Sequence, residues 1–251
     1  NYNELPGEAI VMYSTTVIVN AKNSGQPVVK QEPKPGEKVT VGEKVYLVTK
    51  SDGKAKEVSF AGLDKAGASA KSVAIPAAVQ IEGSSYQVTG IQAKALGGNK
   101  RITSVAVGSN VRTIGKGAFQ NCVNLAKVTF KGKKVTKIDS QAFQNCKKLK
   151  TFKQNGMALK TIGKAAFKGC KSLTGFIVTK NVTQIGANAF LGCTKLKKVV
   201  FMGGRKVKMG SRAFYKTSPK AVFRVPKKRL AYYKKALKKA RINKKAIIKR
   251  R

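Results

Sequence analysis

A pattern of about 24 residues repeats through the second half of this sequence. Five Ala-Phe dipeptides recur with their phenylalanines 24, 24, 23 and 24 residues apart, at Phe119, Phe143, Phe167, Phe190 and Phe214. Five residues before each phenylalanine stands an apolar residue, from Ile114 in the first copy to Met209 in the last. Self-similarity at a fixed period of this length is typical of repeat proteins, whose copies bury their apolar faces only by stacking on one another.

Each copy combines the spacing of a short strand with that of a helical turn. Apolar residues stand nine and eleven positions after the phenylalanine, as in Val128 with Phe130 and Val199 with Phe201. This alternation predicts a strand with one buried face, whereas Ala-Phe-x-x-Cys-x-x-Leu has the three-residue spacing of a helical turn. Since Val73 and Ile75 match an earlier strand, we expect an α/β solenoid that starts near residue 70.

The four cysteines of the chain belong to this repeat, because each follows a phenylalanine by three residues. Equivalent side chains of stacked coils point in parallel into the core, which disfavours disulfides between them. A zinc site would need Cys or His at short spacings, and the chain has no His. We therefore expect free thiols and no metal site, with a repeat core made of Phe119, Cys122, Phe143, Cys146, Phe167, Cys170, Phe190, Cys193 and Phe214.

The motifs associated with catalysis fail on spacing or composition. Gly108 and Gly115 enclose six residues where a phosphate loop has four, and no Ser or Thr follows Lys116, so the glycine is better explained as a turn residue. A cysteine nucleophile has no His to activate it, and burial raises a thiol pKa. Residues 100–251 hold one acidic side chain, Asp139, which leaves no carboxylate pair for a glycosidase. We expect no catalytic residue, no cofactor and no enzymatic activity.

The net charge of +42 is concentrated in the repeat half. Residues 1–99 hold 11 basic and 9 acidic side chains, whereas residues 100–251 hold 41 basic and 1 acidic side chain. Such a field attracts polyanions. The outward positions that flank the strand residues include four basic side chains, and stacking is expected to bring some of them into ladders roughly 5 Å apart. These candidate polyanion-binding residues are Lys127, Lys153, Lys198 and Arg224.

The repeat I-G-x-x-A-F-x-x-C-x-x-L-x-x-V resembles the BspA-like leucine-rich repeat family of bacterial cell-surface proteins. The resemblance covers roughly residues 70–226, with Asp139 in place of the glycine, Leu96 in place of the first Phe and Thr217 in place of a fifth Cys. It implies a curved, right-handed leucine-rich-repeat solenoid exported to the bacterial surface or secreted, where it serves adhesion or recognition. It does not identify a ligand.

The solenoid needs a cap at each end. Residues 1–69 contain the alternating stretches "TTVIVNA" and "KVTVGEKVYLV", which predict an N-terminal β region and cap. Residues 227–251 predict a basic C-terminal helical cap, because Leu230, Tyr233 and Leu237 share one helix face. The family resemblance includes a similar Lys-rich helix after the last repeat. The solenoid would thus span residues 70–226, and an alternative role for the basic helix is that of a membrane-surface anchor.

Two functional hypotheses remain. The first is a noncatalytic surface or secreted adhesion module whose basic face holds anionic glycans, host surface or matrix proteins, or cell-wall polymers. The second is a nonspecific nucleic-acid-binding protein, since a chain this basic binds DNA through counterion release. No motif for specific nucleic-acid recognition is present. The longest apolar run, Ala9–Val19, is too short to predict a membrane span, and the sequence leaves the oligomeric state open.

Overall fold

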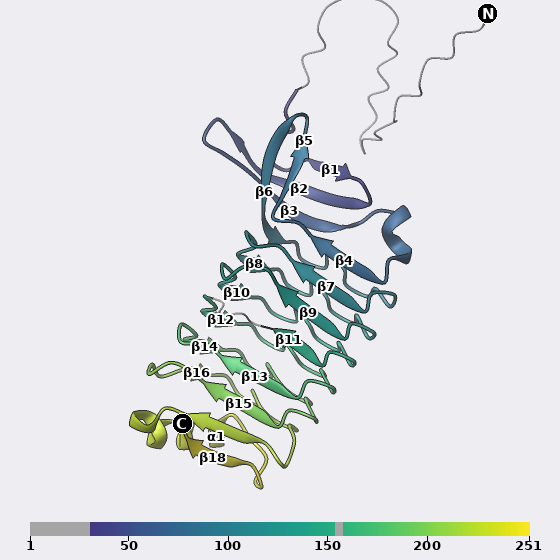
Figure 1. The fold of residues 1–251 in the computed structure, drawn as a ribbon. Helices are drawn as coiled ribbons and strands as arrows, with labels where there is room; N and C mark the ends of the chain where they lie inside the picture. The colour runs from purple at the N-terminus through teal and green to yellow at the C-terminus, as the bar shows by residue number, and fades with distance from the viewer. Residues whose placement is uncertain (1–30, 154–157) are drawn as a thin grey trace, which may run out of the picture.

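The computed structural model describes residues 31–153 and 158–251 and consists of a stack of coils with an N-terminal sheet at one end (Figure 1). The predicted leucine-rich-repeat solenoid is confirmed. Each full coil contributes one longer strand and one short strand. The longer strands are β4 (Ser72–Ile75), β7 (Ser104–Val107), β9 (Lys127–Phe130), β11 (Thr151–Lys153), β13 (Gly175–Val178), β15 (Lys198–Phe201) and β17 (Val222–Val225). The short ones are β8 (Thr113–Ile114), β10 (Lys137–Ile138), β12 (Thr161–Ile162), β14 (Gln184–Ile185) and β16 (Lys208–Met209).

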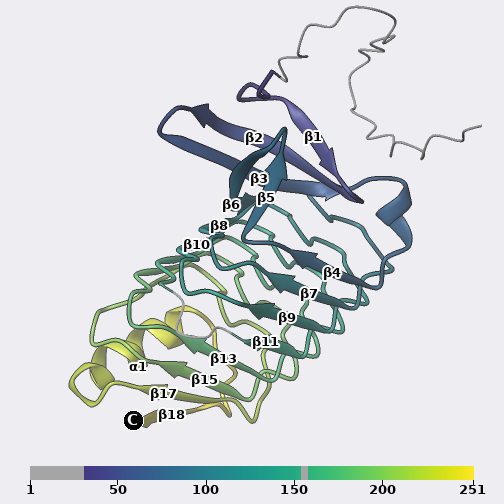
Figure 2. The ribbon, with the colours of Figure 1, turned by 45° about the horizontal axis from the view of Figure 1, so that its top comes forward.

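Strands of neighbouring coils pair in parallel and in register, so that equivalent residues stack. The longer strands form two sheets, in the orders β11-β9-β7-β4 and β13-β15-β17-β18, where β18 (Ile247–Arg250) follows the last coil. Val128 of β9, for example, is paired with Val105 on one side and Phe152 on the other. Their alternate residues are buried, as the period-two pattern predicted. The two sheets follow one another along the same side of the stack (Figure 2).

The turns that carry Ala-Phe-x-x-Cys also link neighbouring coils. Alternate N–H groups bond within the turn and to the next coil: Cys122 N donates to Phe119 O at 3.1 Å, and Phe119 N donates to Ala142 O at 2.8 Å. The phenylalanine rings stack face to face, with centroids 5.0–5.3 Å apart and interplanar angles of 1–10°. All five of these rings and the four cysteine side chains are buried.

The glycine that follows the isoleucine opens a turn, as the sequence suggested, with Ala118 N donating to Gly115 O at 3.2 Å. A Cβ on Gly115 would lie 2.7 Å from Ala93 N and Ile91 O of the preceding coil, and the φ angle of Gly115 is not positive. Glycine is needed at this position because the backbones of neighbouring coils approach each other too closely for a side chain. Positive φ angles occur instead two residues before and after each phenylalanine, as at Gly117 and Asn121.

The N-terminal sheet contains strands from both sides of residue 69. It contains β1 (Lys38–Val41), β2 (Lys44–Asp52) and β3 (Ala55–Leu63), which the 3-10 helix η1 (Ala66–Ser69) follows, together with β5 (Ala78–Ile81) and β6 (Ser84–Ile91). β5 and β6 form an antiparallel hairpin, and β6 pairs in parallel with both β3 and the short strand β8. The cap and the solenoid are therefore joined by one continuous sheet. The predicted strand at "TTVIVNA" lies outside the described residues.

The C-terminal cap has a strand as well as the predicted helix. A 3-10 helix η2 (Lys227–Arg229) leads into α1 (Leu230–Lys239), and β18 (Ile247–Arg250) pairs in parallel with β17. Tyr233 and Leu237 of α1 are buried in the core, as the capping role requires. Phe214 N donates to Ala240 O at 3.1 Å, so Ala240 occupies the place of the alanine of a further coil. No helix in the described part of the chain is long and apolar enough to cross a bilayer.

Candidate polyanion-binding surface

The four predicted basic residues are exposed, but the expected ladder of these residues is wrong. Lys127 is paired with Thr151 and Lys153 with Thr129. Lys198 is paired with Val222, and Arg224 with Val200. Two of the four begin their strands and the other two stand at the third position, and the two residues that share a position lie on strands that are not neighbours. The alternation within each strand correctly predicted that these side chains are exposed. It did not show which residues of neighbouring coils stand side by side.

A denser row of cations lies on the turns just before the longer strands. These segments run from the cysteine position of each coil (Thr217 in the last, Asn99 in the first) to the first residue of the longer strand, and all their Lys and Arg side chains are exposed. We call this row the basic edge. It contains two of the predicted residues, Lys127 and Lys198, and nine that were not singled out. Its members are Lys100, Arg101, Lys127, Lys147, Lys148, Lys150, Lys171, Lys195, Lys197, Lys198 and Lys220.

Hydrogen bonds between coils hold these turns in a continuous row. Asn124 Nδ2 donates to Lys100 O at 2.7 Å, and Ser172 N donates to Lys147 O at 3.2 Å. Further along, Lys197 N donates to Thr174 O at 2.8 Å and Val222 N to Lys197 O at 2.8 Å. At the strand spacing of about 4.8 Å, the six coils of the edge extend over about 24 Å. The backbone is therefore fixed while the lysine side chains remain free to adjust.

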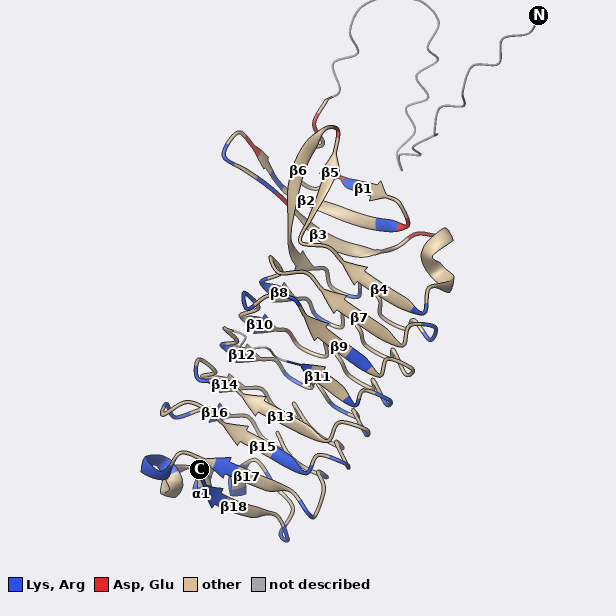
Figure 3. Ribbon diagram, in the orientation of Figure 1, with Lys and Arg blue, Asp and Glu red and all other residues tan. Residues whose placement is uncertain are grey.

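The charge of the edge is not neutralised by nearby carboxylates. Within the described residues, none of its side chains forms a salt bridge, and the ion pairs that occur elsewhere include Arg112 with Glu57 at 3.2 Å and Lys137 with Asp139 at 2.9 Å. Partial burial acts to raise the pKa of Asp139, but the Lys137 hydrogen bond and the Ser140 backbone N–H together outweigh it and lower this pKa. Asp and Glu gather in the N-terminal region, whereas Lys and Arg spread over the solenoid (Figure 3).

The cysteines are placed for packing. All four are free and buried, which confirms the prediction of free thiols. Three of them donate from Sγ to the phenylalanine carbonyl of the preceding coil at 3.1 Å, and Cys122 donates to Leu96 O at 2.9 Å. Burial raises the pKa of the Cys122 thiol to about 12 and raises the pKa values of the other three thiols as well. Among the described residues, no three His, Cys, Asp or Glu side chains are grouped as a metal site would need.

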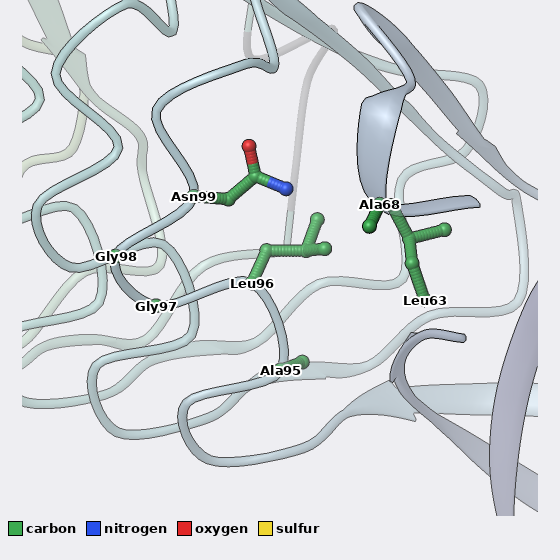
Figure 4. A pocket seen from close by; sticks show the side chains of 7 residues that line it. All are labelled: Leu63, Ala68, Ala95, Leu96, Gly97, Gly98 and Asn99. Carbon is green, nitrogen blue, oxygen red and sulfur yellow. The ribbon is translucent and has the colours of Figure 1, made fainter. Parts of the chain in front are cut away.

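A pocket of about 340 Å³ lies between η1 and the first coil (Figure 4). It is lined by Leu63 and Ala68 on the capping side and by residues 95–99 on the other. Leu96 occupies the position that phenylalanine fills in later coils, and two glycines follow it. The Asn99 side-chain oxygen already accepts from Arg101 N and Ile102 N. With no charged side chain in its lining, this pocket offers an anionic ligand nothing comparable to the basic edge.

Comparisons with known proteins agree with this architecture. The sequence model of the family described as BspA type leucine rich repeat region matches residues 89–221 of this chain in six copies. A leucine rich cell surface protein of Faecalibacterium prausnitzii A2-165 is 24% identical with a TM-score of 0.64, over 79% of this chain and 50% of that one. The leucine rich repeat protein of T. pallidum is 23% identical with a TM-score of 0.59, over 81% and 96% of the two chains. The present chain thus spans half the length of the F. prausnitzii structure, and a search of curated proteins gave no match.

Proposed function

Since the chain belongs to the BspA-type leucine-rich repeat family, we propose that it is a noncatalytic recognition protein of the bacterial surface that binds linear anionic polymers along the basic edge. The proposed ligands are sulfated or sialylated glycans, the glycans of host glycoproteins, and phosphate-rich wall polymers. The proposed location is supported by the described cell-surface character of the F. prausnitzii protein of similar fold.

The observation that carries the proposal is the continuity of the edge. Eleven exposed cations follow one line over six stacked coils, and no acidic side chain interrupts them. A linear polyanion presents charges at intervals along one direction, so that it can contact several coils at once. Each contact releases counterions, and the number of contacts determines how steeply affinity falls with salt. A row of cations therefore fits an extended polymer better than a small anion.

The test is a binding panel of a sulfated glycan, a sialylated glycan, a teichoic-type wall polymer and duplex DNA, each titrated from low to physiological salt. We expect saturable binding of at least one glycan or wall polymer that persists at physiological salt. The edge variant reverses four charges of the row (Lys147→Glu, Lys148→Glu, Lys195→Glu and Lys197→Glu). It should weaken that binding by at least tenfold, given that salt bridges to phosphate or sulfate groups dominate such affinities.

A matched control removes the same charge elsewhere on the solenoid. Lys131, Lys133, Lys164 and Lys180 are also exposed, and none of them belongs to the edge. Reversing these four gives a variant of equal net charge that should retain most of the affinity. Equal losses in both variants would mean that only bulk charge attracts the polymer, and the proposed site would be wrong.

The second candidate function, nonspecific binding of nucleic acid, is favoured by the same charge. It differs from the first in partner selectivity. If DNA bound as tightly as every other polymer, with a steep fall in affinity as salt rises, this second function would replace the first.

A further inference from the structure

The cap at the end of the stack carries more than twice the charge density of the solenoid. Thirteen of the 25 residues 227–251 are Lys or Arg, against 28 of the 127 residues 100–226, and the cap has no acidic residue. Six of the thirteen belong to α1 and β18, which both views place at the end of the stack away from the N-terminal sheet (Figures 1 and 2). The concentration of charge makes this end a surface distinct from the basic edge.

The orientation of α1 is fixed by its buried face. The Tyr233 ring packs against Phe201 with centroids 4.6 Å apart, and Tyr233 Oη donates to Arg205 O at 3.0 Å. Leu237 and Ala240 are buried on the same side. The exposed residues of the opposite side are all basic from the second turn onward, namely Lys234, Lys235, Lys238 and Lys239. Residues spaced i, i+1, i+4 and i+5 on a helix form a compact cluster, with neighbours about 5–6 Å apart at Cβ.

From this arrangement we infer that the end face, defined as the exposed side of α1 together with Lys249 and Arg250, docks on a bilayer that contains anionic phospholipid. A two-dimensional cluster matches headgroups spread in a plane, whereas the one-dimensional basic edge matches a single polymer. The rod would then stand on the membrane, with its N-terminal sheet directed away from it. This inference does not depend on the proposed function of the edge.

Docking at this face is electrostatic and peripheral, without insertion of the helix. An interfacial helix binds by burying its apolar side among the lipids, but α1 uses that side to close the core. Only Ile247 of β18, 49% exposed, adds a large apolar side chain to the end. Lysines close to an anionic leaflet attract it over about a Debye length, so binding should be reversed by salt.

The test is sedimentation of the full chain with vesicles of phosphatidylglycerol mixed with phosphatidylcholine and with vesicles of phosphatidylcholine alone. We expect binding to the first, loss of binding at high salt, and no binding to the second. Reversal of Lys234, Lys235, Lys238 and Lys239 to Glu should lower the partition coefficient at least tenfold, since each lysine near the surface contributes separately. The same four positions changed to Gln should lower it less and in the same direction.

The edge variant (Lys147→Glu, Lys148→Glu, Lys195→Glu and Lys197→Glu) is the matched control. It carries the same net charge as the end-face variant and should keep its vesicle binding while losing its binding to polymers. Circular dichroism and a urea unfolding curve establish that each variant is folded, and the Gln variant supplies the answer if the Glu variant is not. Vesicle binding that falls equally in the edge and end-face variants, or absent from the unmodified chain, would overturn the inference.

Discussion

Gly203 and Gly204 stand side by side, but only the first lies against a neighbouring coil. A Cβ on Gly203 would be 2.6 Å from Lys180 O and 3.0 Å from Lys180 Cα, whereas one on Gly204 would have no atom within 4 Å. Neither glycine has a positive φ, so backbone strain does not separate them. We expect Gly203→Ala to lower the free energy of unfolding by about 1–3 kcal/mol, the usual effect of overpacking.

The neighbouring substitution is the control for this effect. Gly204→Ala should change the free energy of unfolding by less than about 0.5 kcal/mol. Urea unfolding of the two variants measures both values. Similar losses at the two positions would contradict the role of close approach and point to a general requirement for glycine in this loop.

The thiols provide a second prediction at the scale of single residues. Burial raises the pKa of Cys122 from 9.0 to about 12, so the folded state keeps the thiol protonated where the unfolded chain releases the proton. The stability that comes from this difference is complete below the unfolded value and is lost as the pH rises toward the folded one. At about pH 8 a thiol reagent should therefore modify none of the four cysteines of the folded protein.

The control for the thiol prediction is the same reaction in denaturant, where all four cysteines should be modified. Rapid reaction of even one thiol in the folded protein would show that its coil opens easily or that its side chain is accessible. Separate measurement of Cys122, the thiol nearest the N-terminal cap, would then locate the opening.

The inward residues of each coil could be predicted because apolar side chains recur in the same positions of every copy. The left-handed positions were harder to see. Gln141 and Arg212 adopt φ values of 60° and 54° although neither residue type favours that conformation. At Gln141 the backbone N–H donates to Lys164 O of the next coil at 2.8 Å, which helps to fix this conformation. A pattern of residue types therefore reveals burial more readily than backbone conformation.

Among the elements, α1 closes the apolar end that the last coil would otherwise expose to water. Leu237 is fully buried in this interface, and the adjacent Lys238 is exposed. Leu237→Ala should lower the free energy of unfolding by about 2–5 kcal/mol, as for other buried leucines. In a stacked repeat the loss is felt first by the nearest coils. Amide exchange should accelerate more in β15 and β17 than in β7 and β9.

Lys238→Ala serves as the control for the cap, with little expected change in stability or in amide exchange. Uniform acceleration of exchange along the whole stack in Leu237→Ala would mean that the solenoid unfolds as a single cooperative unit. In that case α1 would stabilise the molecule without acting as a local cap.

The helix was predictable from the spacing of three apolar residues, whereas β18 was not. "AIIKRR" has too few alternating residues to mark a strand, and its pairing depends on β17 being left with a free edge. The basic edge was missed for a related reason. Its lysines occupy different positions of the turn in successive copies, so no sequence column contains them all, and only the stacking of the turns brings them into one row.

At the scale of the whole molecule, the net charge of +42 opposes the compact state. Two like charges about 5 Å apart in water repel by about 0.8 kcal/mol, and the strand spacing of about 4.8 Å separates the backbones of the neighbouring coils that carry these lysines. Raising the ionic strength from about 0.01 M to about 0.15 M shortens the screening length from about 30 Å to about 8 Å. We therefore expect the free energy of unfolding to rise by a few kcal/mol over this range, measured from urea midpoints at each salt concentration.

The edge variant, with four charges reversed, should be more stable than the unmodified chain at low salt and should gain less from added salt. If both proteins had the same salt dependence, repulsion along the edge would not lower the free energy of unfolding of the solenoid. The charge of the edge would then be available to bind a partner without destabilising the fold.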